Sequence, residues 1–340
     1  MKKRSQRRSQ SVRVVALGGG TGLSSVLRGL KEHIADRGEH SSRRPIADLA
    51  AIVTVTDDGG SSGRLRREYR VLPPGDIRNC MVALSQDEHL LGKLFQYRFA
   101  TGRGLAGHSF GNLFLTALTK STGDFPRAVQ LSAQVLAIRG RIFPSTAQNV
   151  TLEAELEDGT VVAGETNISR SRRRIARIRL VPRRVRPLPQ VLEAIRKANL
   201  ILIGPGSLYT SIIPNLLVEE VAEVIANSRA TRVYIANLMT QPGETQHYSV
   251  ADHVRAIYEH TRRNLFDFVV INRTPVSPQF LRRYRKEGAE PVEPSFLQLH
   301  RMGLHCVTGA ILQQDGVVRH DQARLTRLLL DKFVEHGSIR

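Results

Sequence analysis

The chain has 340 residues, of which 41% are apolar and only two are cysteines. This composition argues against a disulfide-framed secreted domain, and no apolar run reaches the ~18 residues of a membrane-spanning helix, so we expect a cytoplasmic protein without a membrane partner. Fifty Lys and Arg against 31 Asp and Glu give a net charge of +19, which favours anionic ligands. Nucleic acid is not indicated, because the arginine-rich stretch 170–186 holds no aromatic residue for base stacking.

Residues 1–11 are predicted to form a disordered basic arm, and residues 12–340 a single Rossmann-like domain. The domain begins with an apolar strand (12–17), a glycine-rich loop and a helix with apolar residues at helical spacing. A polar loop at 38–45 and a second strand (49–56) follow. Residues 76–138 have a mostly helical pattern, broken at 102–107 and 123–126. The pattern then alternates, with Asp158-Gly159 as a hairpin turn, which predicts a small β-rich, basic insertion at about 145–187.

Strands and helices alternate again after this insertion. Strands are predicted at 200–203, 233–236 and 268–271, and helices at 191–198, 216–226, 250–260, 280–287 and 323–334. Such alternation predicts an α/β fold with a mostly parallel sheet and helices on both of its faces.

The loop after the first strand is the first candidate site. Gly19, Gly20, Thr21 and Gly22 lie where a helix begins, and the free N–H groups of a helix start bind phosphate. Leu23 stands at the third glycine position of a dinucleotide fingerprint, and no Gly-Lys-Ser/Thr follows as in a P-loop. A phosphate-type ligand is therefore predicted, with a tight turn that binds nothing as the alternative.

The second strand ends in a run of acids, glycines and serines. Asp57 and Asp58 are candidate Mg²⁺ ligands, or catalytic carboxylates if the chain is an enzyme. Ser61 and Ser62 can donate hydrogen bonds to anionic oxygens. The alternative is structural, with aspartate as a helix cap and glycine as a turn.

Two further segments contribute single candidates. Asp76 is expected to cap a helix, Arg78 to clamp a phosphate and Asn79 to bind a base or sugar edge. His108 and Asn112 are four residues apart, and His108 is a candidate general acid or base. Packing is the more common role of a single histidine.

A second glycine-rich loop with Gly206 and Ser207 follows a later strand. Two such loops in one parallel sheet are expected to meet in one crevice. The segment 239–245 could complete that crevice or close over it. The sequence assembles no Ser-His-Asp order, zinc-ligand cluster or kinase signature, so binding is indicated and catalysis is not required.

Several long motifs together resemble the YvcK/CofD-like family, from about residue 12 to the C-terminal helix: LGGGTGLSSVLRGLK, VTVTDDGGSSGRLR, PPGDIRNC, HSFGNLFLTAL, ILIGPGSLYTSIIPNLLV, NLMTQPGETQHYSVADH and GVVRHD. The resemblance implies a cytoplasmic Rossmann-like protein. YvcK-type members are regulators that bind UDP-sugars and support cell shape and growth on gluconeogenic carbon. CofD-type members transfer a phospholactyl group from a nucleoside-diphosphate-activated donor, with Mg²⁺.

Carried over by motif, the resemblance places the two glycine-rich loops on a nucleoside diphosphate and Asp57 and Asp58 at the phosphate or metal. It adds Tyr284 as a stacking ring and Arg319 as a cation for the diphosphate. The hypotheses are therefore a UDP-sugar-binding regulator, a 2-phospho-L-lactate transferase-like enzyme, and a nucleic-acid-binding protein as a distant third. A regulator would act through a protein partner or as a homo-oligomer, and the sequence identifies neither.

Overall fold

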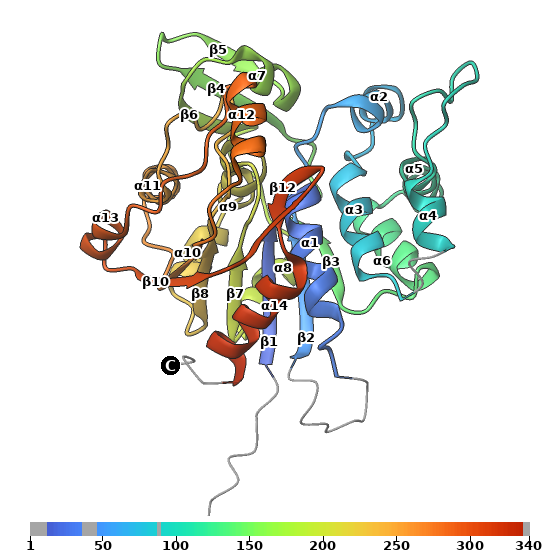
Figure 1. Cartoon of the computed structure of the whole chain (residues 1–340). Helices are drawn as coiled ribbons and strands as arrows, with labels where there is room; N and C mark the ends of the chain where they lie inside the picture. The colour runs from blue at the N-terminus through green and yellow to red at the C-terminus, as the bar shows by residue number, and fades with distance from the viewer. Residues whose placement is uncertain (1–11, 36–45, 87–89, 336–340) are drawn as a thin grey trace, which may run out of the picture.

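A computed structural model describes residues 12–35, 46–86 and 90–335, so the expected basic arm and the loop at 38–45 lie outside it. Its centre is a seven-stranded sheet in the order β10-β9-β8-β7-β1-β2-β3 (Figure 1), in which every neighbouring pair is parallel. The strands are β1 (Val12–Gly18), β2 (Ile46–Val53), β3 (Arg141–Pro144), β7 (Leu200–Ile203), β8 (Thr231–Ile235), β9 (Phe268–Asn272) and β10 (His305–Gly309). The predicted fold class is confirmed.

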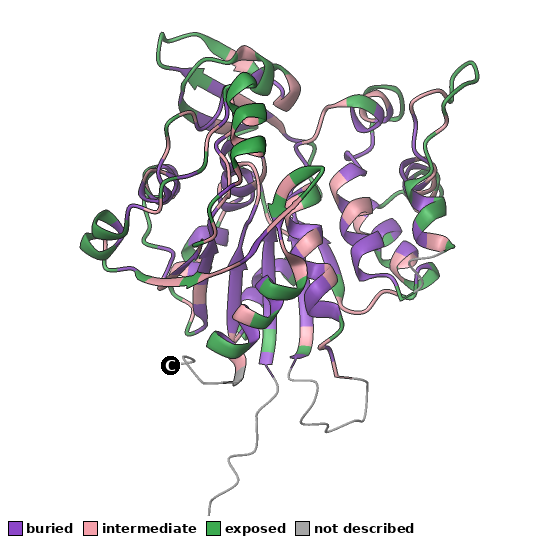
Figure 2. Ribbon diagram, in the orientation of Figure 1, coloured by how far each residue is buried: buried purple, intermediate pink, exposed green. Residues whose placement is uncertain are grey.

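The strands at the centre of the sheet are buried along most of their length (Figure 2). All four residues of β7 are buried apolar residues, as expected of a strand covered on both faces. Around the sheet lie α1 (Gly20–Lys31), α2 (Gly60–Tyr69), α3 (Gly75–Leu84), α4 (Leu91–Gln96), α5 (Phe110–Thr122), α6 (Phe125–Val135), α8 (Pro189–Lys197), α9 (Ile213–Leu216), α10 (Val221–Ala226), α11 (Val250–Thr261), α12 (Pro278–Lys286), α13 (Phe296–Arg301) and α14 (Gln322–Leu330). Helices α1 and α14 pack together in front of the sheet (Figure 1).

The strand order reverses between β1 and β7. From β1 the chain continues to β2 and β3 on one side, whereas β7 leads to β8, β9 and β10 on the other. Right-handed crossovers then place the helices after β1 and those after β7 on opposite faces of the sheet. The loops that follow β1 and β7 therefore diverge, and the crevice between them is where α/β sheets bind ligands.

The predicted β-rich insertion is a separate antiparallel sheet in the order β5-β4-β6, formed by β4 (Thr151–Leu156), β5 (Val161–Ala163) and β6 (Ile175–Val181). Leu152, Ala154 and Leu156 point to the buried face of β4, while Glu153 and Arg179 pair on the open face at 2.9 Å. A helix, α7 (Glu165–Ser171), joins β5 to β6. The sequence analysis did not predict α7.

Three further strands near the C-terminus were also missed. Strand β10 is the outer strand of the main sheet, and its residues are only partly buried or exposed. The antiparallel hairpin of β11 (Leu312–Asp315) and β12 (Val317–His320) stands apart from that sheet. Strands on an edge or in an isolated hairpin bury little apolar area, so their hydrophobic pattern is weak.

Candidate functional site

A cavity of about 890 Å³ opens at the carboxyl ends of β1, β7 and β8. Ten of the sequence-predicted site residues line it: Gly19, Gly20, Thr21, Gly22, Arg78, Asn79, Gly206, Ser207, Tyr284 and Arg319. They come from five separate segments of the chain. The prediction that the two glycine-rich loops share one crevice therefore agrees with the structure.

The two glycine-rich loops touch each other at Gly22. A Cβ atom built on Gly22 would lie 2.3 Å from the carbonyl oxygen of Pro205, closer than real Cβ atoms approach an oxygen. Asn237 holds the second loop from the other side, because its side chain donates to the Gly206 carbonyl at 2.8 Å and accepts from the Gly206 N–H at 3.1 Å. The absence of a side chain at Gly22 is thus what lets the two walls of the cavity meet.

Asp76 lies in the first turn of α3, but its carboxylate reaches the start of α1 instead of capping α3 as expected. The residue that precedes α3 is Pro74, which makes no side-chain cap. The Asp76 carboxylate accepts a hydrogen bond from the Gly20 N–H, and its oxygens lie 2.7 Å from the positions that Cβ atoms on Gly19 and Gly20 would take. Burial and the nearby charge of Asp57 raise the pKa of Asp76 to about 7. An acid therefore occupies the helix start that was predicted to bind phosphate.

Asp57 and Asp58 do not line this cavity. Asp57 accepts a hydrogen bond from the Gly59 N–H at 2.9 Å. One oxygen of Asp58 accepts from both the N–H and the hydroxyl of Thr166, at 2.9 and 2.7 Å. Asp58 thus fastens α7 of the insertion to the loop after β2.

Glu165, next to Thr166 on α7, reaches the cavity itself. Burial, and then the charges of Asp57 and Asp76, raise the pKa of Glu165 well above its ordinary value. These acids influence one another, yet in the described part of the chain no three Asp, Glu, His or Cys side chains converge closely enough to hold a metal ion. A cation here would need ligands from a bound molecule as well.

Ser61, Ser62, His108 and Asn112 form a buried cluster away from the cavity lining. Asn112 donates to the Ser61 hydroxyl at 3.1 Å, and Ser61 lies 3.0 Å from Nδ1 of His108. Burial lowers the pKa of His108, which favours its neutral form. The cluster joins α2 to the start of α5.

The opposite wall of the cavity comes from α12 and the β11–β12 hairpin. The Tyr284 hydroxyl accepts the Val318 N–H at 3.0 Å, which joins α12 to the hairpin. Arg319 donates from Nε to Gln313 at 3.3 Å and lies 3.9 Å from Asp315. Both side chains border the cavity.

Several lining residues were missed or given another role by the sequence analysis: Arg28, Gln96, Arg98, Glu165, Asn237 and His320. Arg28 lies on α1 one helical turn after Ser24, which also lines the cavity. This spacing along the helix from the glycine-rich loop could have indicated Arg28. Glu165 had no such signal, because it depends on how the insertion folds back over the sheet.

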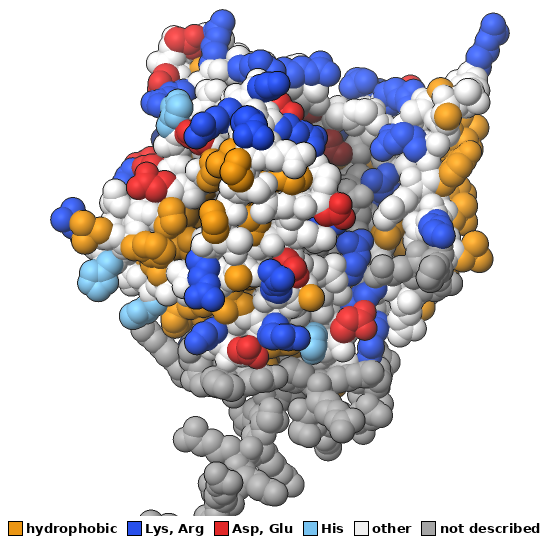
Figure 3. All heavy atoms as spheres, viewed as in Figure 1, with side chains coloured by type: hydrophobic (Ala, Val, Ile, Leu, Met, Phe, Trp, Pro, Cys, Tyr) orange, Lys and Arg blue, Asp and Glu red, His pale blue; other side chains and the backbone are white. Residues whose placement is uncertain are grey.

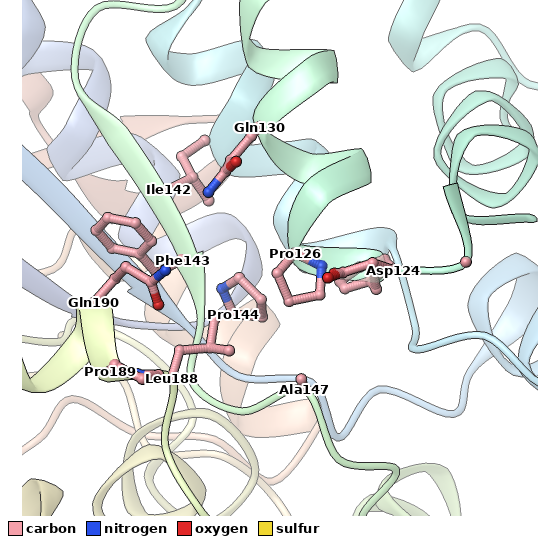
Figure 4. A pocket seen from close by; sticks show the side chains of 12 residues that line it. Asp124, Pro126, Gln130, Ile142, Phe143, Pro144, Ala147, Leu188, Pro189 and Gln190 are labelled. Atoms are coloured by element: carbon pink, nitrogen blue, oxygen red, sulfur yellow. The ribbon is translucent and has the colours of Figure 1, made fainter. Parts of the chain in front are cut away.

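A smaller cavity of about 390 Å³ lies beside the edge strand β3 (Figure 4). Pro126, Phe143, Pro144 and Leu188 form much of its lining. It holds no predicted site residue and no cationic side chain. The cavity at the switch point is therefore the better candidate for an anionic ligand.

Comparison with known proteins identifies the family of the chain. The family described as 2-phospho-L-lactate transferase CofD matches residues 14–312. The gluconeogenesis factor of Bacillus subtilis (strain 168) is 46% identical over 96% of this chain and 99% of that protein. The gluconeogenesis factor of Halalkalibacterium halodurans is 46% identical over 94% of this chain and 95% of its own length.

A crystal structure from Bacillus halodurans, titled a member of the UPF0052 family, has a TM-score of 0.88 at 44% identity. It covers 94% of this chain and 99% of its own. No helix in the described part of this chain has the length and apolar character needed to cross a membrane. The chain belongs to the CofD family, in the group whose members are named gluconeogenesis factors.

Proposed function

We propose that the chain is a cytoplasmic regulator that binds a UDP-sugar in the switch-point cavity and supports gluconeogenic growth and cell shape. The observation that carries the proposal is the pairing of two walls across one cavity of about 890 Å³. One wall is a helix start between glycine-rich loops, and the other offers an aromatic ring and a guanidinium. A volume of ~300–1,000 Å³ is typical of small-molecule sites.

The ligand's diphosphate is assigned to the start of α1, where the N–H groups of Thr21 and Gly22 and the helix dipole favour negative charge. Arg319 is assigned to the same diphosphate from the opposite wall. The ring of Tyr284 suits stacking on uracil. Asn79 and Ser207 offer hydrogen-bonding groups to the sugar.

Asp76 bears on whether a cation accompanies the diphosphate. Its carboxylate at the start of α1 would repel a diphosphate placed there. Asp57 and Asp76 are close enough for the charge of one to raise the pKa of the other, and Mg²⁺ is commonly held by two carboxylates and the phosphates of a ligand. These two residues fit Mg²⁺ better than the predicted pair, because Asp58 is engaged with Thr166. Bound there, Mg²⁺ would neutralise the diphosphate.

Isothermal titration with UDP-N-acetylglucosamine, with and without Mg²⁺, tests this function. Saturable binding is expected, and uridine alone should bind far more weakly because it lacks the diphosphate. An absence of heat at millimolar ligand in both conditions would contradict the proposal.

The acids beside the cavity favour a second function. Asp76 and Glu165 line the cavity, Asp57 is close enough for its charge to raise the pKa of both, and the family description names a transferase. A phospholactyl-type transferase would use such groups to position the donor and neutralise its charge.

Incubation with a deazaflavin acceptor and activated phospholactate, followed by chromatography, tests the transferase. Product that depends on Mg²⁺ and is reduced by Asp57→Asn would establish it. Saturable UDP-sugar binding without any product would leave the regulator as the function.

A further inference from the structure

A third cavity, of about 440 Å³, lies between the insertion and the core. One wall is formed by β6 with Glu155 of β4, and the other by Leu217 after α9 and Arg262 after α11. It shares no residue with the switch-point cavity. Basic side chains also gather over the insertion and α12 at the upper end of the molecule (Figure 3).

The lining of this seam cavity is strongly positive. Four guanidinium groups, those of Arg177, Arg179, Arg183 and Arg262, line it against the single carboxylate of Glu155. They come from β6, the segment after β6 and the end of α11. The fold thus brings like charges from three places in the sequence into one hollow.

Three of these arginines have no acidic partner in the described chain. Their neighbours are paired, as Arg173 is with Asp158 at 2.9 Å, Arg174 with Glu157 at 3.8 Å and Arg179 with Glu153 at 2.9 Å. Arg177, Arg183 and Arg262 make no ion pair with any residue that the structure describes. Arg177 stands opposite Glu155 in the strand register, but the two are not within ion-pair distance. A bound anion would offset the repulsion among these three guanidinium groups.

The backbone conformation of Arg262 makes this residue suitable for a test. Arg262 ends α11 with a φ of 54°, a left-handed conformation, and its N–H bonds the Tyr258 carbonyl. Glycine is the residue that suits this helix-end position, because it has no Cβ penalty there. Arg70 and Arg172 end helices in the same conformation, so the conformation by itself assigns no ligand, but Arg262→Gly removes the guanidinium without straining the backbone.

We propose that the seam cavity is a second anion site, which binds a small phosphorylated molecule between the insertion and the core. Guanidinium groups bind phosphate oxygens in pairs of hydrogen bonds, and the cavity has the volume of a small-metabolite site. The phosphate would join Arg177 and Arg183 of the insertion side to Arg262 of the core.

Because the seam cavity lies between the insertion and the core, a bound phosphate should affect the stability of the whole chain. The insertion is fastened to the core by Asp58 and Thr166 and carries Glu165 into the switch-point cavity. The Ile178 N–H of β6 already bonds Nε2 of His260 on α11 at 3.0 Å, and a phosphate in the seam would add a further link beside this one. The whole chain should therefore become more stable when the seam cavity is filled.

Inorganic phosphate is the probe, with thermal unfolding and ³¹P NMR line width as readouts and sodium chloride at matched ionic strength as the control. Wild type should gain thermal stability with phosphate beyond the chloride effect. Arg262→Gly and Arg183→Gln should each weaken the apparent phosphate affinity by roughly tenfold, the size expected for a lost charge-assisted hydrogen bond. Arg184→Gln, which removes a nearby arginine outside the lining, should bind as wild type does.

Arg262→Gly suits the test because glycine fits the left-handed position, so this variant should fold at least as well as wild type. Arg319→Ala removes one of the arginines that line the switch-point cavity and should keep the phosphate effect. Unchanged phosphate binding in both Arg262→Gly and Arg183→Gln would overturn the proposal. So would a phosphate effect no larger than that of chloride, or one that only Arg319→Ala removes.

Discussion

Replacing Gly22 by alanine tests how the two walls of the switch-point cavity meet. The new Cβ would lie 2.3 Å from the Pro205 carbonyl oxygen and 2.9 Å from its carbonyl carbon. Both are backbone atoms, so no side chain can rotate away to make room. Either α1 or the loop after β7 must move.

The expected change in the free energy of unfolding of Gly22→Ala is the sum of two opposing effects. Overpacking a well-packed contact costs ~1–3 kcal/mol of the free energy of unfolding. Alanine in place of glycine within a helix returns up to ~1 kcal/mol, and Gly22 lies in the first turn of α1. A net loss of about 1–2 kcal/mol is therefore expected.

Urea unfolding followed by circular dichroism measures this difference, and Gly206→Ala is the matched control. Gly206 lies across the same contact, but a Cβ on it would be 3.5 Å from the nearest atom, the Cβ of Ser211, an ordinary contact. Gly206→Ala should change stability by less than ~0.5 kcal/mol. Wild-type stability in Gly22→Ala, or a larger loss in Gly206→Ala, would refute the close approach of the loops.

Two further predictions concern stability. Gly29→Ala should destabilise the chain by about 1–3 kcal/mol, because its Cβ would lie 1.9 Å from the Thr326 hydroxyl where α1 crosses α14. Adding Thr326→Ala should restore most of that stability in urea unfolding. If the double variant is no more stable than Gly29→Ala, the contact with Thr326 is not the cause of the loss. For Asp76, burial and Asp57 raise the pKa to about 7, so between about pH 4 and pH 7 the folded chain keeps a proton that the unfolded chain releases. This stabilising contribution is complete below about pH 4 and lost as the pH rises through 7. In this range the free energy of unfolding of Asp76→Asn should therefore have a pH slope more positive than that of wild type, by up to about 1.4 kcal/mol per pH unit, and equal slopes would contradict the raised pKa.

The sequence was most informative where a feature is local. Buried parallel strands such as Leu200–Ile203 are short apolar runs between turn residues, and both glycine-rich loops follow such strands. Their meeting in one crevice also followed, because the carboxyl ends of parallel strands lie on one edge of a sheet. Tyr284 and Arg319 came from motif resemblance alone.

Features that depend on distant packing could not be predicted. Asp76 looked like a helix cap, but the approach of α3 to α1 places its carboxylate on the Gly20 N–H. Asp58 looked like a metal ligand, but α7 of the insertion lies against it. In both cases the partner of the carboxylate comes from a segment whose position the sequence does not reveal.

The central claim is that the switch-point cavity binds a nucleoside-diphosphate sugar between the start of α1 and Arg319. Titration of UDP-N-acetylglucosamine into wild type and Arg319→Ala, with equal thermal stability of the two proteins as the control, tests it most directly. We predict saturable binding to wild type and a loss of at least roughly tenfold in affinity for Arg319→Ala, as for a broken charge-assisted hydrogen bond. Equal affinity of the two proteins, or no binding to wild type, would contradict the account.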